Sequence, residues 1–378
     1  MKITRVVTHF LSIPCTAHTE HAPLIGGREW THFDVVLIRI DTDEGITGWG
    51  EAFGRARDLP LKAVIDTHIA PKLIGKDPTQ IAVIKKQLEF ELHNFGRIGP
   101  VAYGIAGVDI ALWDILGKRA GLPLYALLGG KYTSKIDVYA SLLRYGTVSE
   151  VERITHKVLE EGYRHIKLHE IGIQENLAAR RAAGPDIPIY LDVNCPWDVR
   201  QAIDASHALA EGKFGWLEEP VWPPENYAGI AEVRRRGALR TAAGENAGSA
   251  ADFKLAFEAG ALDFAQPDLT KTLGISEAIR IAALADAYNV AVVPHNAVYG
   301  PGLLATLHFN ASRPDTPPLE RLYFALEKHP LSQALEPVNG SIAVPETPGL
   351  GFDPDPEVIG DTRSVCPNWH GACLLYTS

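Results

Sequence analysis

The sequence predicts an α/β protein in which a (β/α)8-type, TIM-like barrel carries a separate α+β capping domain. Polar side chains stand at the ends of successive short apolar runs, at Lys167, Asp192, Glu218, Glu245, Asp268, His295 and Glu320. The intervals between them are 25, 26, 27, 23, 27 and 25 residues, about the length of one strand, two loops and a three-turn helix. This register indicates a parallel barrel, in which the chemistry lies at the carboxyl ends of the strands.

Two further observations support this fold class. The apolar runs are continuous, as expected for strands that are buried on both faces. The chain has 378 residues, about a hundred more than the roughly 250 of a bare barrel. We therefore expect a capping domain over 1–125, the barrel over 126–328, and a C-terminal segment over 329–365 that packs on the cap. Residues 366–378 are expected to be a tail, in which 373–378 resemble a translated sequencing adapter and are expected to be non-native.

The first part of the chain has the pattern of a small α+β module. Residues 33–40 and 46–51 read as strands, and Gly45 between them predicts a hairpin. From residue 58 to residue 120 the apolar period becomes helical, and the following Gly-Leu-Pro stops it.

The barrel is predicted to begin with a strand over 139–143, followed by a helix over 150–161. After the last polar strand end, the chain becomes rich in Pro and Gly and has one short strand at 341–344. We expect this part to pack back on the N-terminal module over the barrel mouth.

Composition excludes several classes of protein. The net charge is −10 and no basic run occurs, which disfavours binding to nucleic acid or to an anionic membrane. The N-terminus lacks a signal-peptide core and no apolar stretch approaches 18 residues. The four cysteines form no CxxC pair, which suits reduced thiols. We expect a cytoplasmic enzyme.

Three carboxylates, Asp192, Glu218 and Glu245, fall on successive predicted strands. Carboxylates that converge at neighbouring strand ends repel one another unless a cation or a proton intervenes. Because no sulfur or imidazole is among them, a hard, oxygen-preferring ion is expected, and Mg²⁺ with open positions for substrate fits best. Helix capping or pairing with Lys and Arg is the alternative interpretation.

The next two strands carry Asp268 and His295. The Asp can accept a hydrogen bond from one ring nitrogen, which fixes the tautomer and leaves the other nitrogen free for proton transfer. On the opposite side, Lys167 and His169 both face the mouth if Leu168 points away, as the period of a strand requires. A metal with such groups on both sides suits removal of the proton next to a carboxylate and stabilisation of the enediolate.

The motifs Gly107–Asp114, Leu217–Pro220, Gly244-Glu245 and Leu319–Leu322, with the Asp and His above, resemble the enolase superfamily and within it the mandelate racemase subgroup. The resemblance covers nearly the whole chain and implies an enolase-type modified barrel. It also implies that three carboxylates bind Mg²⁺, that His295 with Asp268 is an acid/base, and that Glu320 hydrogen-bonds the substrate carboxylate. Family members are often octamers or dimers, so a homo-oligomer is expected.

The sequence departs from the subgroup at one position. The subgroup usually ends its second strand with Lys-x-Lys, whereas this chain has Lys167-Leu168-His169. By resemblance Lys167 contacts the carboxylate. The imidazole of His169 is shorter than a Lys side chain and titrates nearer pH 7, so whether His169 serves as a second base is left open. Racemisation needs two bases, and dehydration can use one. We expect a lyase that dehydrates an aldonate or aldarate to a 2-keto-3-deoxy acid; a racemase, epimerase or sugar-lactone cycloisomerase is the alternative.

Other residues are candidates for contact with a small hydroxy-acid substrate. In this family the first loop closes over the site, so His21 and Arg28 in this loop are candidates for contact with substrate. Arg28 could pair with a distal carboxylate of the substrate. Asn194 and Trp197 follow the first metal-binding Asp, and Asn296 follows the catalytic His. A solvated loop is the alternative for the first two.

Competing enzyme classes fit less well. Gly300-Pro301-Gly302 does not directly follow a strand end, as a nicotinamide-binding loop would. An amidohydrolase-type barrel needs His-x-His on its first strand, and Ala140-Ser141-Leu142 has none. A barrel that binds a ligand without turnover stays open.

Overall fold

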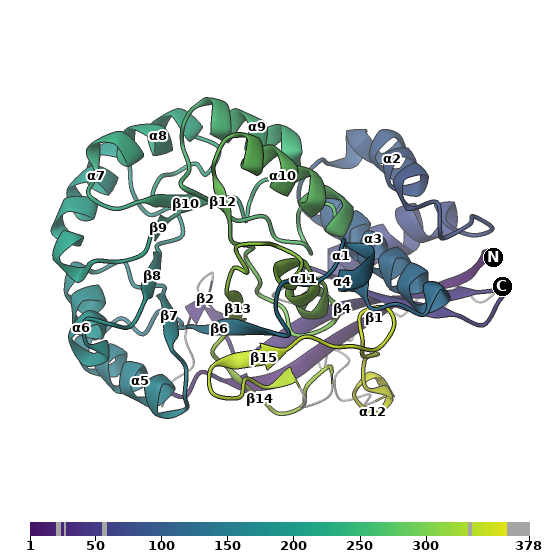
Figure 1. Cartoon of the computed structure of the whole chain (residues 1–378), viewed down its shortest axis with the longest axis horizontal. Coiled ribbons are helices and arrows are strands. Elements are labelled where there is room, and N and C mark those ends of the chain that lie inside the picture. The colour runs from purple at the N-terminus through teal and green to yellow at the C-terminus, as the bar shows by residue number, and fades with distance from the viewer. Residues whose placement is uncertain (20–23, 26–27, 55–58, 332–334, 361–378) are drawn as a thin grey trace.

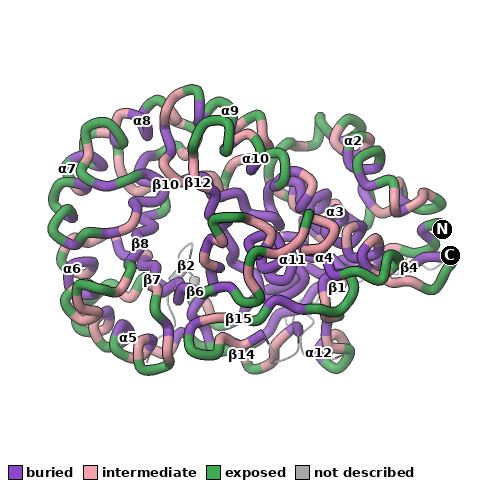
Figure 2. The backbone as a smooth tube through the Cα atoms, viewed as in Figure 1, coloured by how far each residue is buried: buried purple, intermediate pink, exposed green. Residues whose placement is uncertain are grey.

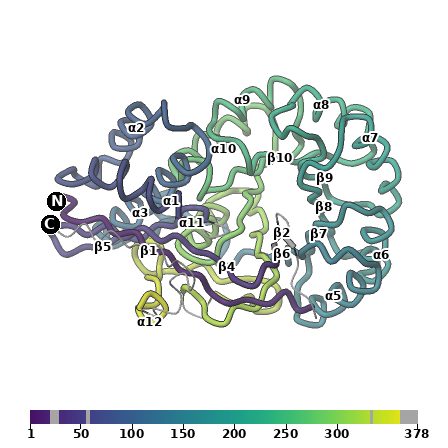
Figure 3. The backbone as a smooth tube through the Cα atoms, turned by 180° about the vertical axis from the view of Figure 1, so that it is seen from behind, coloured from purple at the N-terminus to yellow at the C-terminus, as the bar shows by residue number. Residues whose placement is uncertain are grey.

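The computed structural model describes residues 1–19, 24–25, 28–54, 59–331 and 335–360. Figure 1 shows a ring of helices around short strands beside a second part with long strands, in which the chain begins. Seen from behind in Figure 3, the same ring and the same neighbouring part are recognisable. The predicted fold class, a barrel with an α+β cap, is confirmed.

The cap is built on a sheet with the strand order β14-β1-β4-β5. Its strands are β1 (Ile3–Thr16), β4 (His32–Thr42), β5 (Thr47–Ala52) and β14 (Ala325–Leu326). β1 and β4 pair antiparallel over their whole length. Gly45, with a φ of 77°, turns the chain from β4 into β5, where the sequence predicts a hairpin. A separate two-stranded hairpin is formed by β2 (Leu24–Ile25) and β3 (Arg28–Glu29).

Helices pack against this sheet. They are α1 (Leu59–Val64), α2 (Ile81–Leu92), α3 (Pro100–Ala120) and α4 (Leu124–Leu127), with short turns η1 (Ile65–Ile69), η2 (Ala70–Lys72) and η3 (His93–Phe95). α3 approaches β5 so closely that a Cβ on Gly50 would lie 1.8 Å from the carbonyl oxygen of Gly107. α3 is long and apolar enough to cross a membrane, but 78% of its most apolar window is buried inside the protein, as in the core helix of a globular domain.

Eight barrel strands lie in the described part of the chain. They are β6 (Lys135–Ser141), β7 (His165–Leu168), β8 (Ile189–Asp192), β9 (Leu217–Glu218), β10 (Thr241–Ala243), β11 (Phe264–Ala265), β12 (Ala291–Val292) and β13 (Leu319–Leu322). Consecutive strands pair in parallel from β6 to β12, and β13 pairs with β6. The carboxyl ends of all eight strands therefore face the same side.

The barrel helices connect these strands on the outside. They are α5 (Val148–Glu160), α6 (Ile173–Ala183), α7 (Val199–Ala208) with the turn η4 (Ala210–Gly212), α8 (Tyr227–Arg236), α9 (Ala250–Glu258), α10 (Ile275–Ala287) and α11 (Pro301–Ala311). α5 to α10 form the outer arc of the ring in Figure 1. Their outward faces are exposed and the strands inside are buried, as Figure 2 shows.

α11 differs from the other barrel helices. It connects β12 to β13, and within the described residues no ladder joins these two strands. Every residue of α11 is buried, because β5, α3 and α4 of the cap pack against the helix. The cap and the barrel thus share this element of their cores.

The C-terminal segment divides between the cap and the barrel. Leu350 N–H donates to Asp114 of α3 at 2.9 Å, and Asp353 pairs with Lys118 of α3 at 2.6 Å. The predicted short strand forms as β15 (Ser341–Ala343), but it pairs antiparallel with the beginning of β6, at the end of the barrel opposite the mouth. This pairing also explains why β6 begins at Lys135 and not at residue 139 as predicted. The final helix α12 (Pro356–Gly360) does reach the cap, where Val358 joins an apolar cluster with Leu11.

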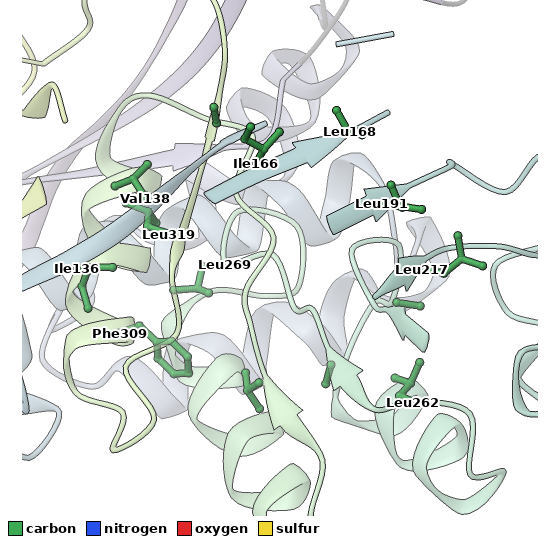
Figure 4. Packing of buried hydrophobic residues seen from close by; sticks show 14 of the residues in the cluster. Ile136, Val138, Ile166, Leu168, Leu191, Leu217, Leu262, Leu269, Phe309 and Leu319 are labelled. Atoms are coloured by element: carbon green, nitrogen blue, oxygen red, sulfur yellow. The ribbon is translucent and has the colours of Figure 1, made fainter. Parts of the chain in front are cut away.

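The main apolar core lies between the barrel strands and their helices. Leu168, Leu191 and Leu217 on neighbouring strands are at most 1% exposed, and Figure 4 shows them pointing away from the barrel axis among the surrounding helices. Burial of such side chains contributes about 1.5–3 kcal/mol each. Because alternate residues face the other way, the polar residues between and after them face the inside and the mouth of the barrel.

Candidate active site

The three predicted metal ligands come together at the barrel mouth. Asp192 ends β8, Glu218 ends β9, and Glu245 lies two residues beyond β10. Each offers one oxygen, and these atoms all lie within 4.8 Å of one another. Burial, followed by the charge of Asp192, raises the pKa of Glu218 well above its ordinary value. An all-oxygen set that repels itself in this way fits a hard divalent cation such as Mg²⁺.

Lys167 lies within this cluster from the inner face of β7. Its Nζ is 2.7 Å from Glu320 Oε1, 3.1 Å from Glu218 Oε1 and 3.3 Å from Asp192 Oδ2. Burial alone would lower the pKa of Lys167, but the charges of these carboxylates raise it well above its ordinary value. The ammonium of Lys167 thus lies within 3.3 Å of three carboxylates, whose charges favour its protonated form.

His295 and Asp268 form the predicted pair. His295 Nδ1 is 2.6 Å from Asp268 Oδ2, and Asp268 Oδ1 accepts hydrogen bonds from the backbone N–H and the hydroxyl of Thr270 at 2.7 and 2.6 Å. With Nδ1 donating to Asp268, Nε2 is the nitrogen that can exchange a proton. Nε2 lies 2.8 Å from Glu245 Oε2, at the edge of the carboxylate cluster.

His169 follows Lys167 by two residues and faces the same side, because Leu168 between them is buried in the core. Its Nδ1 contacts the carbonyl oxygen of Leu142, which can only accept a hydrogen bond, so Nδ1 carries a proton. Its Nε2 lies 3.1 Å from Asp192 Oδ2. The ring therefore lies beside the metal-binding cluster, on the side away from His295.

Glu320 is held by several donors on the last strand. Ser141 Oγ donates to Oε1 at 2.7 Å, and Tyr139 Oη donates to Oε2 at 3.1 Å. The backbone N–H of Asn296 also donates to Oε2, at 3.2 Å. The side-chain amide of Asn296, which was predicted to bind substrate, is instead used inside the protein, donating to the carbonyl oxygens of Val298 and Glu320.

Of the remaining residues predicted to contact substrate, two lie near the mouth and the other two fall outside the described side chains. Asn194 is exposed at the mouth, and its backbone N–H and its Nδ2 donate to Asp192 Oδ1 at 3.0 and 2.9 Å. Trp197 is half-buried against the core beside β9. Arg28 lies in β3 with a side chain outside the described part of the structure, and His21 lies outside the described residues.

Several residues that support the cluster were missed by the sequence analysis. Trp216 Nε1 and Gln266 Nε2 donate to Glu218 Oε2 at 3.0 and 2.7 Å. Lys271, 4% exposed, lies with Nζ 3.1 Å from Glu245 Oε1 and 4.7 Å from the ring centre of Phe53 in the cap. Trp216 precedes Glu218 by two residues, so the period of the strand could have identified it.

Comparison with known proteins identifies the family. The family model described as "Enolase C-terminal domain-like" matches residues 150–358. The model described as "Mandelate racemase / muconate lactonizing enzyme, N-terminal domain" matches residues 20–129. Together these matches cover most of the cap and of the barrel, and they agree with the resemblance inferred from the motifs.

Curated relatives extend the match over most of the chain. The protein is 35% identical to D-galactarolactone cycloisomerase from Agrobacterium fabrum, over 97% of this chain and 100% of the relative. It is 32% identical to D-galactonate dehydratase from Ralstonia pickettii, over 88% of this chain and 92% of the relative. Both relatives are enzymes named for sugar acids or their lactones, so this protein is an enzyme of the same general type.

A solved structure supports the cofactor. A racemase from Streptomyces coelicolor A3(2) with bound magnesium superimposes with a TM-score of 0.85 and 29% identity, over 95% of this chain and 99% of that chain. With the oxygen cluster described above, this similarity confirms the prediction of Mg²⁺ as cofactor. The protein belongs to the mandelate racemase/muconate lactonizing enzyme family of the enolase superfamily.

Proposed function

We propose that the enzyme removes the proton from C2 of a sugar acid and eliminates the C3 hydroxyl group, which gives a 2-keto-3-deoxy acid. One observation carries this proposal. A single His–Asp pair, His295 with Asp268, stands at the carboxylate cluster, whereas the ammonium of Lys167 on the other side is already bound to carboxylates. One imidazole oriented by a carboxylate suits dehydration better than racemisation, which needs a base on each side of the carbon. On the other side, His169 has the carbonyl oxygen of Leu142 at Nδ1 where His295 has a carboxylate.

The residues are assigned to roles by their position. Asp192, Glu218 and Glu245 would hold Mg²⁺, which when bound supplies the positive charge that stabilises an enediolate. Lys167 binds and orients the substrate carboxylate, and Glu320, 2.7 Å from the Lys167 ammonium, accepts a hydrogen bond from a neighbouring substrate hydroxyl. Asn194 is placed to bind the hydroxyl on C2.

Proton transfer is assigned to His295. Nε2 accepts the C2 proton and then gives a proton to the departing C3 hydroxyl, which leaves as water. The resulting enol takes up a proton at C3 as it converts to the ketone. Asp268 keeps Nδ1 protonated throughout, which maintains Nε2 as the reactive nitrogen.

A second candidate is the cycloisomerisation of a sugar lactone. It is favoured by the full-length similarity to D-galactarolactone cycloisomerase. The early chemistry would be the same, and only the fate of the enediolate would differ. The two candidates are therefore separated by the substrate consumed, an open-chain acid that loses water or a lactone that loses none, and not by their active-site residues.

The test is incubation of the purified protein with Mg²⁺ and a panel of aldonates, aldarates and their lactones. A semicarbazone assay detects 2-keto-3-deoxy acids, and NMR in D2O detects exchange at C2. We expect a keto product that EDTA and His295→Asn abolish, while His207→Asn on the exposed side of α7 has no effect. A keto product formed from a lactone but not from the open-chain acid would replace dehydration by cycloisomerisation, and activity that persists in His295→Asn would refute the assigned role.

A further inference from the structure

Arg144 lies at the barrel mouth, just beyond the end of β6, and its side chain is exposed. Its Nε donates to the carbonyl oxygen of His169 at 2.7 Å, and its Nη2 donates to the carbonyl oxygen of Val193 at 3.4 Å. Nη2 also lies 3.3 Å from Asn194 Oδ1. These bonds fix the guanidinium over the ends of β7 and β8, next to the cluster that would hold the metal.

Arg144 forms no ion pair with a carboxylate within the described residues. Its three acceptors are two backbone carbonyl groups and one amide, and none is a carboxylate. Glu170, from the neighbouring loop, instead accepts from the backbone N–H groups of Tyr145 and Gly146. The lysines of the site differ in this respect, since Lys167 and Lys271 each lie within 3.1 Å of a carboxylate oxygen.

One nitrogen of the guanidinium, Nη1, is left over from these bonds within the described part of the chain. No acceptor for Nη1 occurs among the residues that the structure describes, although Nε and Nη2 have partners. The N–H groups of Nη1 can donate charge-assisted hydrogen bonds to a carboxylate. Arg144 and Asp192 are linked through only two hydrogen bonds, from Arg144 Nη2 to Asn194 Oδ1 and from Asn194 Nδ2 to Asp192 Oδ1. A short carbon chain can therefore span the space between them.

We propose that Arg144 binds a second carboxylate of the substrate, at the end remote from C2, and that the enzyme therefore prefers dicarboxylic sugar acids to monocarboxylic ones. This inference rests on the proposed function, in which Lys167 takes the carboxylate next to C2. It assigns the distal carboxylate to Arg144 of the barrel, where the sequence pointed to Arg28 of the cap.

The test uses pairs of substrates that differ only at the distal carbon, galactarate with galactonate and glucarate with gluconate. The full-length, Mg²⁺-loaded protein is compared with Arg144→Gln and Arg144→Lys. Arg181→Gln is the matched control, because Arg181 is 57% exposed at the C-terminal end of α6, on the face opposite the mouth. 6-Phosphogluconate is included because a guanidinium also binds phosphate.

For the preferred aldarate, Arg144→Gln should lower kcat/KM by about 10- to 100-fold, the range for loss of charge-assisted hydrogen bonds. The matching aldonate should change by less than about threefold, Arg144→Lys should be intermediate, and Arg181→Gln should match the wild type. Equal losses on both substrates, a wild-type preference for the aldonate, or a preference for 6-phosphogluconate would each overturn the inference while leaving the proposed function intact.

Binding of an unreactive probe makes the inference independent of turnover. Glutarate and its monoamide have the same shape but differ by one carboxylate, and their binding can be followed by the fluorescence of Trp197 and Trp222 beside the mouth. Glutarate should bind about 10- to 100-fold more tightly to the wild type, and Arg144→Gln should abolish the difference. If Arg144→Gln still prefers glutarate to the monoamide, the role of Arg144 is refuted. If Arg144→Gln loses this preference but no substrate in the panel is turned over, the role of Arg144 is upheld and the proposed function is refuted.

Discussion

Trp216→Phe is expected to weaken Mg²⁺ binding without disturbing the fold. The substitution removes the Nε1–H that donates to Glu218 Oε2 at 3.0 Å, but it keeps an aromatic ring in the stack with Tyr190, whose ring centre lies 3.7 Å away. A hydrogen bond to a charged group contributes about 1.5–3 kcal/mol. Gln266 still donates to the same oxygen at 2.7 Å, so we take the lower value, about 1.5 kcal/mol, which corresponds to roughly tenfold weaker binding.

The assay is calorimetric titration of Mg²⁺ into protein that has been freed of metal with EDTA. The matched control is Trp222→Phe, which makes the same change at a side chain that is 69% exposed. Because burial and Asp192 already raise the pKa of Glu218, loss of a donor raises it further, and protons then compete better with the metal. The defect in Trp216→Phe should therefore be larger at pH 6 than at pH 8.

The reasoning is refuted if Trp216→Phe binds Mg²⁺ within about twofold of the wild type at both pH values. An equal loss in Trp222→Phe would show that the effect is not specific to the bond to Glu218. Gln266→Leu removes the other donor to the same oxygen. Since both donors serve one acceptor, the effects of Trp216→Phe and Gln266→Leu should not be additive.

Three further predictions concern stability. Burial raises the pKa of Glu51 to about 8, so between about pH 4.5 and 8 the folded protein holds a proton that the unfolded chain releases. The free energy of unfolding should fall through this window by up to about 1.4 kcal/mol per pH unit, and Glu51→Gln should flatten the slope in urea titrations. Gly50→Ala should cost at least about 3 kcal/mol, because its Cβ would meet the Gly107 backbone at 1.8 Å; thermal unfolding measures this. At a hundred times its Kd, Mg²⁺ should add about 2.7 kcal/mol of stability, most of it lost in Asp192→Asn.

Control measurements separate these three specific effects from a nonspecific loss of stability. Gly360→Ala places a Cβ where nothing lies within 4 Å, so equal destabilisation by both glycine variants would contradict the packing argument. Glu160→Gln changes an exposed carboxylate of α5 and should keep the wild-type slope with pH. A Mg²⁺ effect of the same size in Asp192→Asn would argue against this residue as a ligand.

The barrel and its polar strand ends could be predicted from the sequence because both follow from local patterns. Continuous apolar runs mark doubly buried strands, and one polar residue at each end fixes where the mouth lies. The pairing of His295 with Asp268 follows from their positions on adjacent strands. These inferences need only the order of strands, which a barrel supplies.

Long-range pairings were less accessible to sequence analysis. β15 reads as an isolated short strand, and no local pattern shows that it extends β6 at the far end of the barrel. Arg144 and Lys271 read as ordinary charged loop residues. Their interest arises from what surrounds them, carbonyl groups in one case and a metal-binding carboxylate in the other, and surroundings of this kind depend on the tertiary fold. Asn296 shows the converse error, since its place after His295 suggested contact with substrate, but its amide is used inside the protein.

The full burial of α11 has a consequence for engineering substrate specificity by exchanging caps between relatives. α11 belongs to the barrel by connectivity, yet its outer face is covered by β5, α3 and α4, and Glu51 of β5 accepts hydrogen bonds from Gly300 and Gly302 at its N-terminus, each at 3.0 Å. A chimaera joined at the boundary between cap and barrel would therefore place a foreign surface against a helix shaped for the original one. Transplanting α11 together with the cap keeps that interface native and moves the junction into the exposed outer ring.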